Sequence, residues 1–200
     1  MLEFLFYFLL AYIFGSIPFA LVIALPQGVD PRKEGSKNPG ATNVARLLGK
    51  KWGILTFLGD AGKGILALYL VRFLSSYDFQ EAPFLYAGCA FFAVSGHIFS
   101  IFLKFKGGKG VATTIGTFLI LTPKALIPAL LIFALAVYIT NYVSVGSLLT
   151  TALLPLFIYL FRYPSEYVYC GILLAIIIWI KHKDNIKRLI RGEEKTWKKK

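Results

Sequence analysis

LEFLFYFLLAYIFGSIPFALVIAL, residues 2–25, is an apolar run that is long enough to cross a lipid bilayer as one helix. A helix rises about 1.5 Å per residue, so about 20 residues span the ~30 Å hydrocarbon core. Glu3 stands where a secretory signal peptide would carry basic residues, and no clear small-residue cleavage site follows. We therefore expect a retained transmembrane helix.

The rest of the chain shares this apolar character. Of its 200 residues, 57% are hydrophobic, and the mean hydropathy is +0.67, which exceeds what one small soluble core could bury. Lys and Arg number 22 against 10 Asp and Glu, and this excess favours anionic headgroups or anionic substrates over nucleic acid as partners. Cys89 and Cys170 lie in apolar runs, and no Cys/His spacing resembles a zinc site, so neither disulfides nor a metal is expected.

Seven apolar segments predict an all-α, polytopic membrane helical bundle that forms a single domain over residues 1–200. Lys and Arg are concentrated in alternate connections, with six between Gln27 and Lys51, three between Lys104 and Lys109, and nine from Lys181 onward. Because these cations resist translocation, the N-terminus is predicted outside and the C-terminus in the cytosol. The fourth segment has only 12 residues, which is short for a crossing. The segments are Leu2–Leu25, Trp52–Leu74, Pro83–Phe102, Gly110–Leu121, Ala125–Ile139, Val145–Phe161 and Tyr167–Ile180.

The first polar cluster is Gly35-Ser36-Lys37-Asn38-Pro39-Gly40-Ala41-Thr42-Asn43-Val44-Ala45-Arg46. Asn-Pro-Gly breaks regular structure, and a helix that restarts at Ala41 would point its early backbone N–H groups at an anion. Asn43 and Arg46 are three residues apart and share a face of that helix. The alternative is a capped surface hairpin with a solvated arginine.

The second cluster contains Gly96-His97-Ile98-Phe99-Ser100 and then Lys104-Phe105-Lys106-Gly107-Gly108-Lys109-Gly110. Consecutive glycines allow backbone amides to form a concave anion-binding nest, and three lysines add positive charge. The pattern is not a Walker A loop, because Gly110 follows Lys109 where that motif requires Ser or Thr. A flexible linker with ordinary positive-inside lysines is the alternative.

Two weaker clusters lie further along the chain. Asn141 and Ser144 flank a tight turn, where such residues are ordinarily helix caps. Residues 179–189 continue the last apolar segment as a basic helix, on which His182 and Asn185 are three residues apart. That helix could instead be an interfacial anchor on anionic lipid. All four clusters fall on the cytosolic side of the predicted topology, and this convergence indicates an active site there.

Asp60 and Lys63 lie within the second apolar segment, three residues apart. Charges at membrane depth are costly unless they are paired or face a cavity. Their spacing lets them pair with each other, so a structural salt bridge is favoured over a catalytic role. Residues 15–18, Gly-Ser-Ile-Pro, similarly predict a kink or a close helix contact in the first segment.

The three long clusters together resemble the bacterial acyl-phosphate-dependent glycerol-3-phosphate acyltransferase family over essentially the whole chain. The matching motifs are Gly35–Arg46, Gly96–Ser100 with Lys106–Thr113, and Lys181–Leu189. The resemblance implies transfer of a fatty acyl group from acyl phosphate to the 1-hydroxyl of sn-glycerol 3-phosphate, which gives lysophosphatidic acid and inorganic phosphate. It also implies a multi-pass protein of the bacterial cytoplasmic (inner) membrane, in contact with membrane lipids and without a bound cofactor. The oligomeric state is left open.

In such a reaction, cationic side chains and backbone amides must bring two anionic substrates together. We expect one set of residues to bind glycerol 3-phosphate and a second set to bind acyl phosphate. The first set is Ser36, Arg46, Lys104, His182 and Asn185, with Lys106 and Ser144 as further members. The second set is the turn from Asn38 to Asn43, which includes Gly40 and Thr42, and the nest of Gly107, Gly108, Lys109 and Gly110.

Only His97 and His182 titrate near the pH at which a general base must act, and the sequence shows no acidic orienting partner for either. The His-x4-Asp pair of another acyltransferase class is absent, because Phe102 and Lys187 stand five residues after these histidines. Acyl phosphate is already activated. We therefore favour a substrate-assisted route, in which the acceptor's own phosphate takes the proton, over His182 as the base.

Two other functions fit parts of the pattern. A transporter of phosphorylated metabolites could use Asp60, Lys63 and the short segments, but it would distribute polar groups along a path through the membrane. A noncatalytic scaffold could dock anionic lipid through the basic tail, but it would not need the glycine nest.

Overall fold

The structure is a computed structural model that describes residues 2–197. Regular structure in that range is helical throughout, as predicted, and the chain divides into two compact units between Leu121 and Thr122. The first unit holds α1 (Leu2–Ser16), α2 (Phe19–Ala24), the 3-10 helix η1 (Leu25–Gln27), α3 (Ala41–Leu48), α4 (Lys50–Ser75), α5 (Pro83–Ile98), the 3-10 helix η2 (Ile101–Leu103) and α6 (Val111–Leu121). The second holds α7 (Pro123–Thr140), α8 (Val143–Leu160), α9 (Ser165–Lys181) and α10 (Lys183–Ile190).

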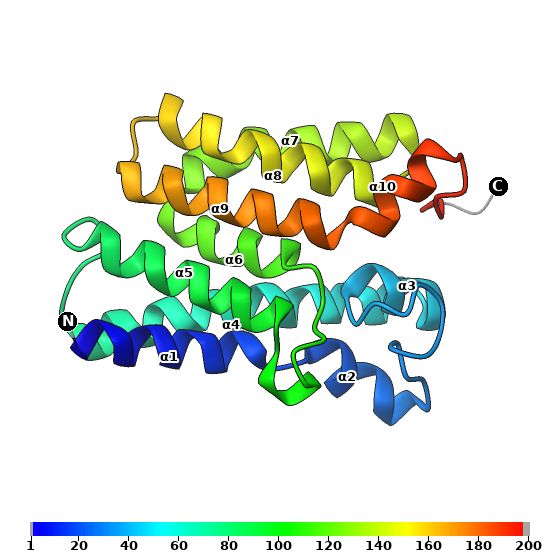
Figure 1. Cartoon of the computed structure of the whole chain (residues 1–200), viewed down its shortest axis with the longest axis horizontal. Helices are drawn as coiled ribbons and strands as arrows, with labels where there is room; N and C mark the ends of the chain where they lie inside the picture. The colour runs from blue at the N-terminus through cyan, green and yellow to red at the C-terminus, as the bar shows by residue number, and fades with distance from the viewer. Residues whose placement is uncertain (1, 198–200) are drawn as a thin grey trace. The chain divides into compact units, whose positions relative to one another are not determined.

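In the first unit, α1 and α4 pack against α5, α6 packs against α4, and the short α3 packs on α4 (Figure 1). The first apolar segment is broken at Ile17 and Pro18, between α1 and α2, because proline lacks the backbone N–H that a continuous helix needs. At Gly15, α1 lies so close to α5 that a β-carbon would meet the backbone of Ala93. The kink and the close contact predicted for residues 15–18 are both confirmed.

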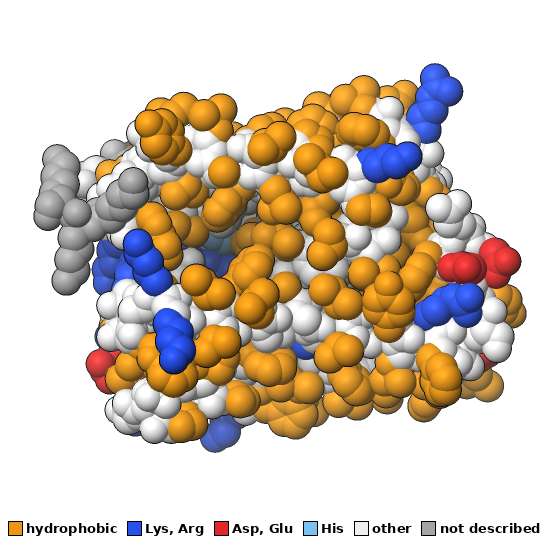
Figure 2. Space-filling model, turned by 180° about the vertical axis from the view of Figure 1, so that it is seen from behind, with side chains coloured by type: hydrophobic (Ala, Val, Ile, Leu, Met, Phe, Trp, Pro, Cys, Tyr) orange, Lys and Arg blue, Asp and Glu red, His pale blue; other side chains and the backbone are white. Residues whose placement is uncertain are grey.

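The outer faces of these helices are apolar, where a water-soluble helix would carry a polar face. Figure 2 shows hydrophobic side chains over much of the face that it draws. Lipid is a better solvent than water for such a surface, because an α-helix satisfies its own backbone groups and leaves only side chains to be solvated. Exposed apolar side chains include Leu5 and Leu9 on α1, Ile54 and Leu58 on α4, and Leu131 and Leu135 on α7.

In the second unit, α8 packs against both α7 and α9 (Figure 1). Thr150 Oγ1 donates a hydrogen bond to the carbonyl oxygen of Ala129 over 3.1 Å, which ties α8 to α7. Trp179 Nε1 donates to the carbonyl oxygen of Leu148 over 3.2 Å, which ties α9 to α8. Hydrogen bonds of this kind help to hold helices together in lipid, where the hydrophobic effect does not drive association. The chain bends by 60° between α9 and α10.

Each of the seven predicted segments corresponds to a helical part of the structure. Among the described residues, five stretches are long and apolar enough to cross a bilayer alone, and α9 with α10 makes a bent sixth. The remaining predicted segment corresponds to α6, which has 11 residues, or about 16 Å of helix, and is shorter than the hydrocarbon core. The number of crossings and their orientation stay predictions. The five stretches are 2–27, 50–75, 83–103, 123–140 and 143–160.

Candidate active site

The loop before α3 is fastened by Asn43, a residue of the predicted acyl phosphate set. The side chain is buried, and its Nδ2 donates hydrogen bonds to the carbonyl oxygens of Pro31 (2.9 Å) and Glu34 (3.1 Å). Its Oδ1 accepts the backbone N–H of Ser36 over 2.8 Å. Three hydrogen bonds use most of the capacity of one amide side chain. Asn43 therefore holds the loop in one conformation, a role that its spacing in the sequence did not indicate.

The fastened loop ties the backbone of Ser36 to Asn43, in the first turn of α3. Arg46 follows Asn43 by three residues, so both side chains leave the same face of α3. Ser36 and Arg46 are each partly exposed, which leaves both accessible to a small anion. Two members of the predicted glycerol 3-phosphate set thus belong to α3 and the loop before it, with Ser36 tied to the first turn of the helix and Arg46 in its last turn.

The predicted Asn38–Asn43 turn forms the start of α3. Gly40 has an extended backbone with φ −152° directly before the helix, and its carbonyl oxygen accepts the N–H of Asn43 over 3.0 Å. A β-carbon at Gly40 would lie 2.8 Å from Asn38 Nδ2, so the Asn38 side chain lies over this glycine. Thr42 is in the first turn of α3 and is partly exposed. This turn therefore contains early helix N–H groups and two polar side chains, which are the kinds of group that bind an anion at a helix start.

The glycine-rich loop connects α5 to α6. Gly107 N–H donates to the carbonyl oxygen of Ile98, and Gly108 N–H donates to that of His97, each over 3.1 Å. These two amides already donate within the protein. The anion-binding part of the predicted nest is therefore limited to the next two residues, Lys109 and Gly110. Gly110 has φ +92°, a backbone conformation that side-chain-bearing residues rarely adopt, and α6 begins at the next residue.

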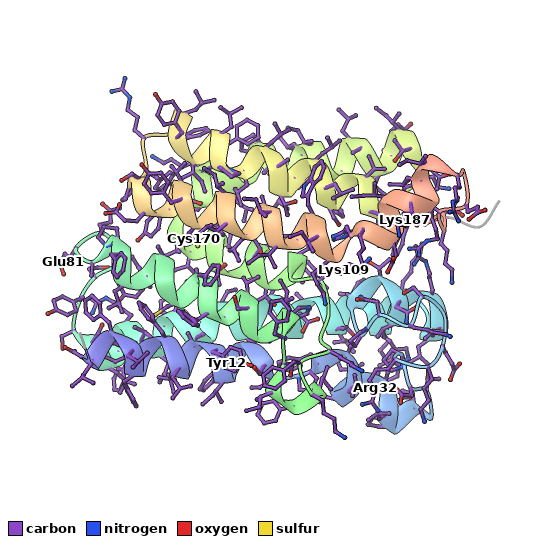
Figure 3. The ribbon with its side chains drawn as sticks, in the orientation of Figure 1. Tyr12, Arg32, Glu81, Lys109, Cys170 and Lys187 are labelled. Atoms are coloured by element: carbon purple, nitrogen blue, oxygen red, sulfur yellow. The ribbon has the colours of Figure 1, made fainter. Side chains whose placement is uncertain are left out.

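The three lysines of this loop supply its positive charge. Lys104 and Lys106 are exposed, and Lys109 lies partly exposed in the connection just before α6 (Figure 3). The turn that carries Lys104 is tied to α1, because Ser100 Oγ donates to the carbonyl oxygen of Ser16 over 2.6 Å. The loop backbone is therefore anchored while its ammonium groups remain accessible to an anionic substrate.

A buried polar cluster joins α4 to the end of α5. Lys63 Nζ lies 2.8 Å from Asp60 Oδ1, and both side chains are 2% exposed, which confirms the predicted salt bridge. Lys63 Nζ also lies 2.9 Å from His97 Nδ1, and that nitrogen lies 3.4 Å from Asp60 Oδ1. The sequence shows no acidic partner for His97, and in the structure a carboxylate does lie near its ring, although Lys63 is the nearer group. Asp60 reaches His97 from a different helix, so sequence spacing could not reveal the pair.

In the second unit, Glu194 is the centre of a second buried polar cluster. Its Oε1 accepts hydrogen bonds from Ser144 Oγ (3.0 Å) and Asn185 Nδ2 (2.6 Å), and its Oε2 accepts one from Arg188 Nε (2.7 Å). Ser144 and Asn185, two predicted substrate ligands, thus converge on a carboxylate of the protein. Sequence reasoning missed Glu194. The available signal was the pair Glu193 and Glu194, two carboxylates at the end of a predominantly basic helix and tail.

His182 lies at the junction of α9 and α10 and is 3% exposed. Its Nδ1 lies 2.8 Å from the carbonyl oxygen of Ile178. A carbonyl oxygen only accepts hydrogen bonds, so Nδ1 carries a proton and donates it. The ring orientation is therefore fixed by the end of α9. Lys187 lies further along on α10 (Figure 3).

We expect the attachment of the C-terminal tail through Glu194 to depend on pH. Burial raises the pKa of this carboxyl, but hydrogen bonds from Asn185, Arg188 and Ser144 outweigh burial and lower the pKa below its ordinary value of 4.5. Because the folded-state pKa is the lower one, the ionised contacts stabilise attachment above pH 4.5. Their contribution is lost as the pH falls through the folded-state pKa.

Hydrogen exchange of the tail should show this dependence. The backbone N–H of Trp197 donates to the carbonyl oxygen of Asn141 over 2.8 Å. We expect its protection factor to fall as the pH drops below 4.5, and to be low already at pH 7 in Glu194→Ala. Glu193→Ala, a change at the exposed neighbouring glutamate, should keep the wild-type behaviour. Equal protection in Glu194→Ala and the wild type would contradict the assignment.

The candidate residues are divided between the two units. Those of the first unit occupy the loop before α3 and the loop before α6, and those of the second occupy the start of α8 and the junction of α9 with α10. The first group offers cationic side chains and hydrogen-bond donors to an anion, whereas in the second group Ser144 and Asn185 donate to Glu194. The first group is Ser36, Asn38, Gly40, Thr42, Asn43, Arg46, Lys104, Lys106, Gly107, Gly108, Lys109 and Gly110, and the second is Ser144, His182 and Asn185.

Known proteins that resemble this chain agree in their description. The family model described as Glycerol-3-phosphate acyltransferase matches residues 5–192. A protein named glycerol-3-phosphate acyltransferase from Desulfotalea psychrophila is 48% identical over 193 residues, which cover 96% of this chain and 97% of that protein. One of the same name from Trichlorobacter lovleyi is 44% identical over 188 residues, which cover 94% of each.

Solved structures give the same result for the fold. A crystal structure of PlsY, an integral membrane glycerol 3-phosphate acyltransferase, in its glycerol 3-phosphate form has a TM-score of 0.90 and 36% sequence identity. The match covers 96% of this chain and 94% of that one. The lysophosphatidic acid form of PlsY has a TM-score of 0.88 and 35% identity. The predicted all-helical, multi-pass membrane fold is therefore confirmed.

Proposed function

The chain belongs to the glycerol-3-phosphate acyltransferase family, and we propose that it takes its acyl group from acyl phosphate and acylates the 1-hydroxyl of sn-glycerol 3-phosphate. It is a multi-pass membrane enzyme of phospholipid synthesis that transfers an acyl group to glycerol 3-phosphate. The products of the proposed reaction are lysophosphatidic acid and inorganic phosphate. These relationships do not favour the alternative function, a transporter of phosphorylated metabolites.

In the proposed step, the 1-hydroxyl oxygen attacks the carbonyl carbon of acyl phosphate. An ester C–O bond forms, the bond from the carbonyl carbon to the phosphate oxygen breaks, and inorganic phosphate leaves with that electron pair. The hydroxyl proton passes to the phosphate of the acceptor. Because the donor is activated and the accepting oxygen belongs to the same bound substrate, positioning can replace a strong protein base.

The main support for this proposal is the loop that Asn43 holds in place. Its three hydrogen bonds hold the backbone of Ser36 in place before substrate arrives, and donors fixed in advance need no reorganisation in the transition state. A planar guanidinium also suits a phosphate, because two of its N–H groups can bind two oxygens at once. We therefore keep Arg46 as the main cation for the acceptor phosphate.

The remaining residues are assigned by the charge and the hydrogen-bonding groups that each can offer a phosphate. We assign the acceptor, glycerol 3-phosphate, to Ser36, Arg46, Lys104, His182 and Asn185, with Lys106 and Ser144 as further contacts. Acyl phosphate is assigned to the Asn38–Asn43 turn and to the loop that ends at Gly110, where α6 begins. In this proposal the two units together form one membrane-embedded acyltransferase domain.

The donor is tested directly with the purified full-length protein. Incubation with acyl phosphate and glycerol 3-phosphate should release equimolar inorganic phosphate and lysophosphatidic acid. Acyl-CoA or acyl carrier protein in place of acyl phosphate should give no lysophosphatidic acid. Turnover with acyl-CoA but not with acyl phosphate would overturn the proposed donor and leave the family assignment in place.

We also propose that the active site faces the cytosol from the bacterial inner membrane, because the connections rich in Lys and Arg carry the candidate residues. Single cysteines in a Cys89→Ala, Cys170→Ala background can test this. On intact spheroplasts, a membrane-impermeant maleimide should label Gln80→Cys, in the exposed turn after α4, and leave Lys106→Cys unlabelled until lysis. The reverse pattern would contradict the orientation.

Substitution of His182 tests the substrate-assisted route, in which the acceptor's own phosphate, rather than this histidine, takes the hydroxyl proton. Removal of a general base lowers turnover by about 10²–10⁴-fold. We expect His182→Ala to lower kcat by less than about 10-fold and to raise the KM for glycerol 3-phosphate, because His182 is proposed to bind the acceptor rather than to take its proton. Steady-state kinetics measure both constants, with thermal unfolding as the check that the variant is folded. A loss of kcat within the general-base range would overturn the route.

A further inference from the structure

The buried cluster around Lys63 uses every donor of its ammonium group. Lys63 Nζ lies 2.8 Å from Asp60 Oδ1, 2.8 Å from the carbonyl oxygen of Ile17 and 2.9 Å from His97 Nδ1. An ammonium group has three N–H donors and no acceptor. The three neighbours therefore match the three protons one to one. A cation in this position is both paired with a carboxylate and fully hydrogen-bonded.

This arrangement determines which nitrogen of His97 carries the proton. Since Lys63 can only donate, Nδ1 must accept, and in a neutral imidazole the proton then resides on Nε2. The alternative is a proton on Nδ1 that is donated to Asp60, but that distance is 3.4 Å against 2.9 Å to Lys63. A proton on Nδ1 would also point at an ammonium group. The contacts therefore favour the Nε2–H form.

The Nε2 edge of His97 lies where the two candidate loops of the first unit meet. A β-carbon added to Gly108 would collide with His97 Nε2, and the carbonyl oxygen of Pro39 would lie 3.1 Å from that same β-carbon. Gly108 belongs to the glycine-rich loop and Pro39 to the loop before α3. The backbone of Gly108 also donates to the carbonyl oxygen of His97 over 3.1 Å. The imidazole is thus packed against both loops.

We propose that Lys63 is a positioning residue for acyl transfer, which holds His97 as its Nε2–H form and directs that N–H to the junction of the Pro39 and Gly108 backbones. The inference rests on the proposed function, because these two loops are there assigned to acyl phosphate. In this form His97 acts as a hydrogen-bond donor that keeps the two loops in register. It cannot act as the general base, because Nδ1 is occupied by Lys63 and Nε2 already carries a proton.

The protonation state can be observed without any substrate. The sequence has two histidines, so His182→Asn in the full chain leaves His97 as the only ring signal. Two-dimensional ¹H–¹⁵N spectra of ¹⁵N-histidine-labelled protein in micelles at pH 7 should show protonated Nε2 and unprotonated Nδ1. Asp60→Asn with Lys63→Met removes the ammonium donor and the carboxylate together, and should shift His97 away from this pattern. A protonated Nδ1 in the protein with Lys63 intact would overturn the proposal.

Kinetics of folded variants test whether the donor matters for the reaction. His97→Gln can place an amide N–H near the position of Nε2, whereas His97→Asn can still accept from Lys63 through its oxygen but loses the Nε2 donor. We expect kcat/KM to fall at least 10-fold further in His97→Asn than in His97→Gln, and at least 10-fold in the Asp60→Asn, Lys63→Met variant.

If Lys63 and His97 only stabilise the fold, the result is different. The unfolding temperature of all three variants would fall, but kcat/KM per folded molecule would stay within threefold of wild type. That outcome would overturn the positioning role. Failure of the proposed donor chemistry is distinguishable, because it would appear as a wild-type protein that releases no phosphate from acyl phosphate, whatever the ring signal of His97 shows.

Discussion

Arg46→Ala is expected to lower kcat/KM for glycerol 3-phosphate by roughly 30-fold to several thousand-fold. Removal of one partner of a close, hydrogen-bonded charge pair costs about 2–5 kcal/mol, and each 1.4 kcal/mol corresponds to about tenfold. Arg46 is partly exposed on the face of α3 that Asn43 fixes, so its loss removes a positioned cation while the loop stays fastened. Initial rates at saturating acyl phosphate, with the acceptor concentration varied, measure the effect.

Two further substitutions distinguish the loss of a specific contact at Arg46 from the loss of one positive charge. Arg32→Ala removes the same charge from the same connection, at a residue whose guanidinium forms an exposed ion pair with Asp30. We expect it to leave kcat/KM within about twofold of wild type, because exposed pairs contribute little. Arg46→Lys keeps the charge without the planar fork and should give an intermediate loss. An unchanged KM for glycerol 3-phosphate in Arg46→Ala would remove this residue from the acceptor site.

The sequence was sufficient for features whose partners lie within one helix or whose geometry follows from residue type. The apolar runs predicted the helices, the Asp60 and Lys63 spacing predicted their salt bridge, and Pro18 predicted the break between α1 and α2. These properties depend on helix periodicity and on the chemistry of single residues. The short α6 was also foreseen from the length of its apolar run.

The sequence could not predict hydrogen bonds between residues that are far apart in the chain and meet only in the folded protein. Asn43 was predicted to bind substrate, but most of its hydrogen-bonding capacity is used on the loop at residues 31–36. The amides of Gly107 and Gly108 were predicted to face an anion, but they bond to the end of α5. Glu194 was not considered, because its position in the tail does not show which distant residue, here Ser144, it contacts. Such hydrogen bonds require the tertiary structure.

The two buried clusters have one feature in common. Each contains a charged residue that lies next to a candidate site but was not among the predicted substrate ligands. In the first unit, Lys63 is held by Asp60 and reaches His97 behind the glycine-rich loop. In the second, Glu194 draws Asn185 and Arg188 together at the bend after α9. Rigid supporting groups of this kind keep substrate-binding residues within the narrow geometry that catalysis needs. Their removal should therefore affect both the stability of the protein and the geometry of the candidate sites.

Asp60→Asn is expected to destabilise the protein by about 3–5 kcal/mol, the usual cost of removing one partner from a buried ion pair. The substitution keeps the shape of the side chain but leaves Lys63, which is 2% exposed, without its counter-charge. Chemical unfolding in detergent, followed by helix content, measures the loss. Asp78→Asn is the matched control, because Asp78 pairs with Arg72 at 3.5 Å in an exposed position and should change stability little.

Adding Lys63→Met to Asp60→Asn should recover most of that stability, because a buried pair replaced by neutral groups of similar size is often near neutral in free energy. The recovery distinguishes an uncompensated charge from lost packing, since packing defects at adjacent positions would accumulate instead. Asp60→Asn as stable as the wild type would show that other groups neutralise Lys63. A double variant no more stable than the single one would show that shape, rather than charge, holds α4 against α5.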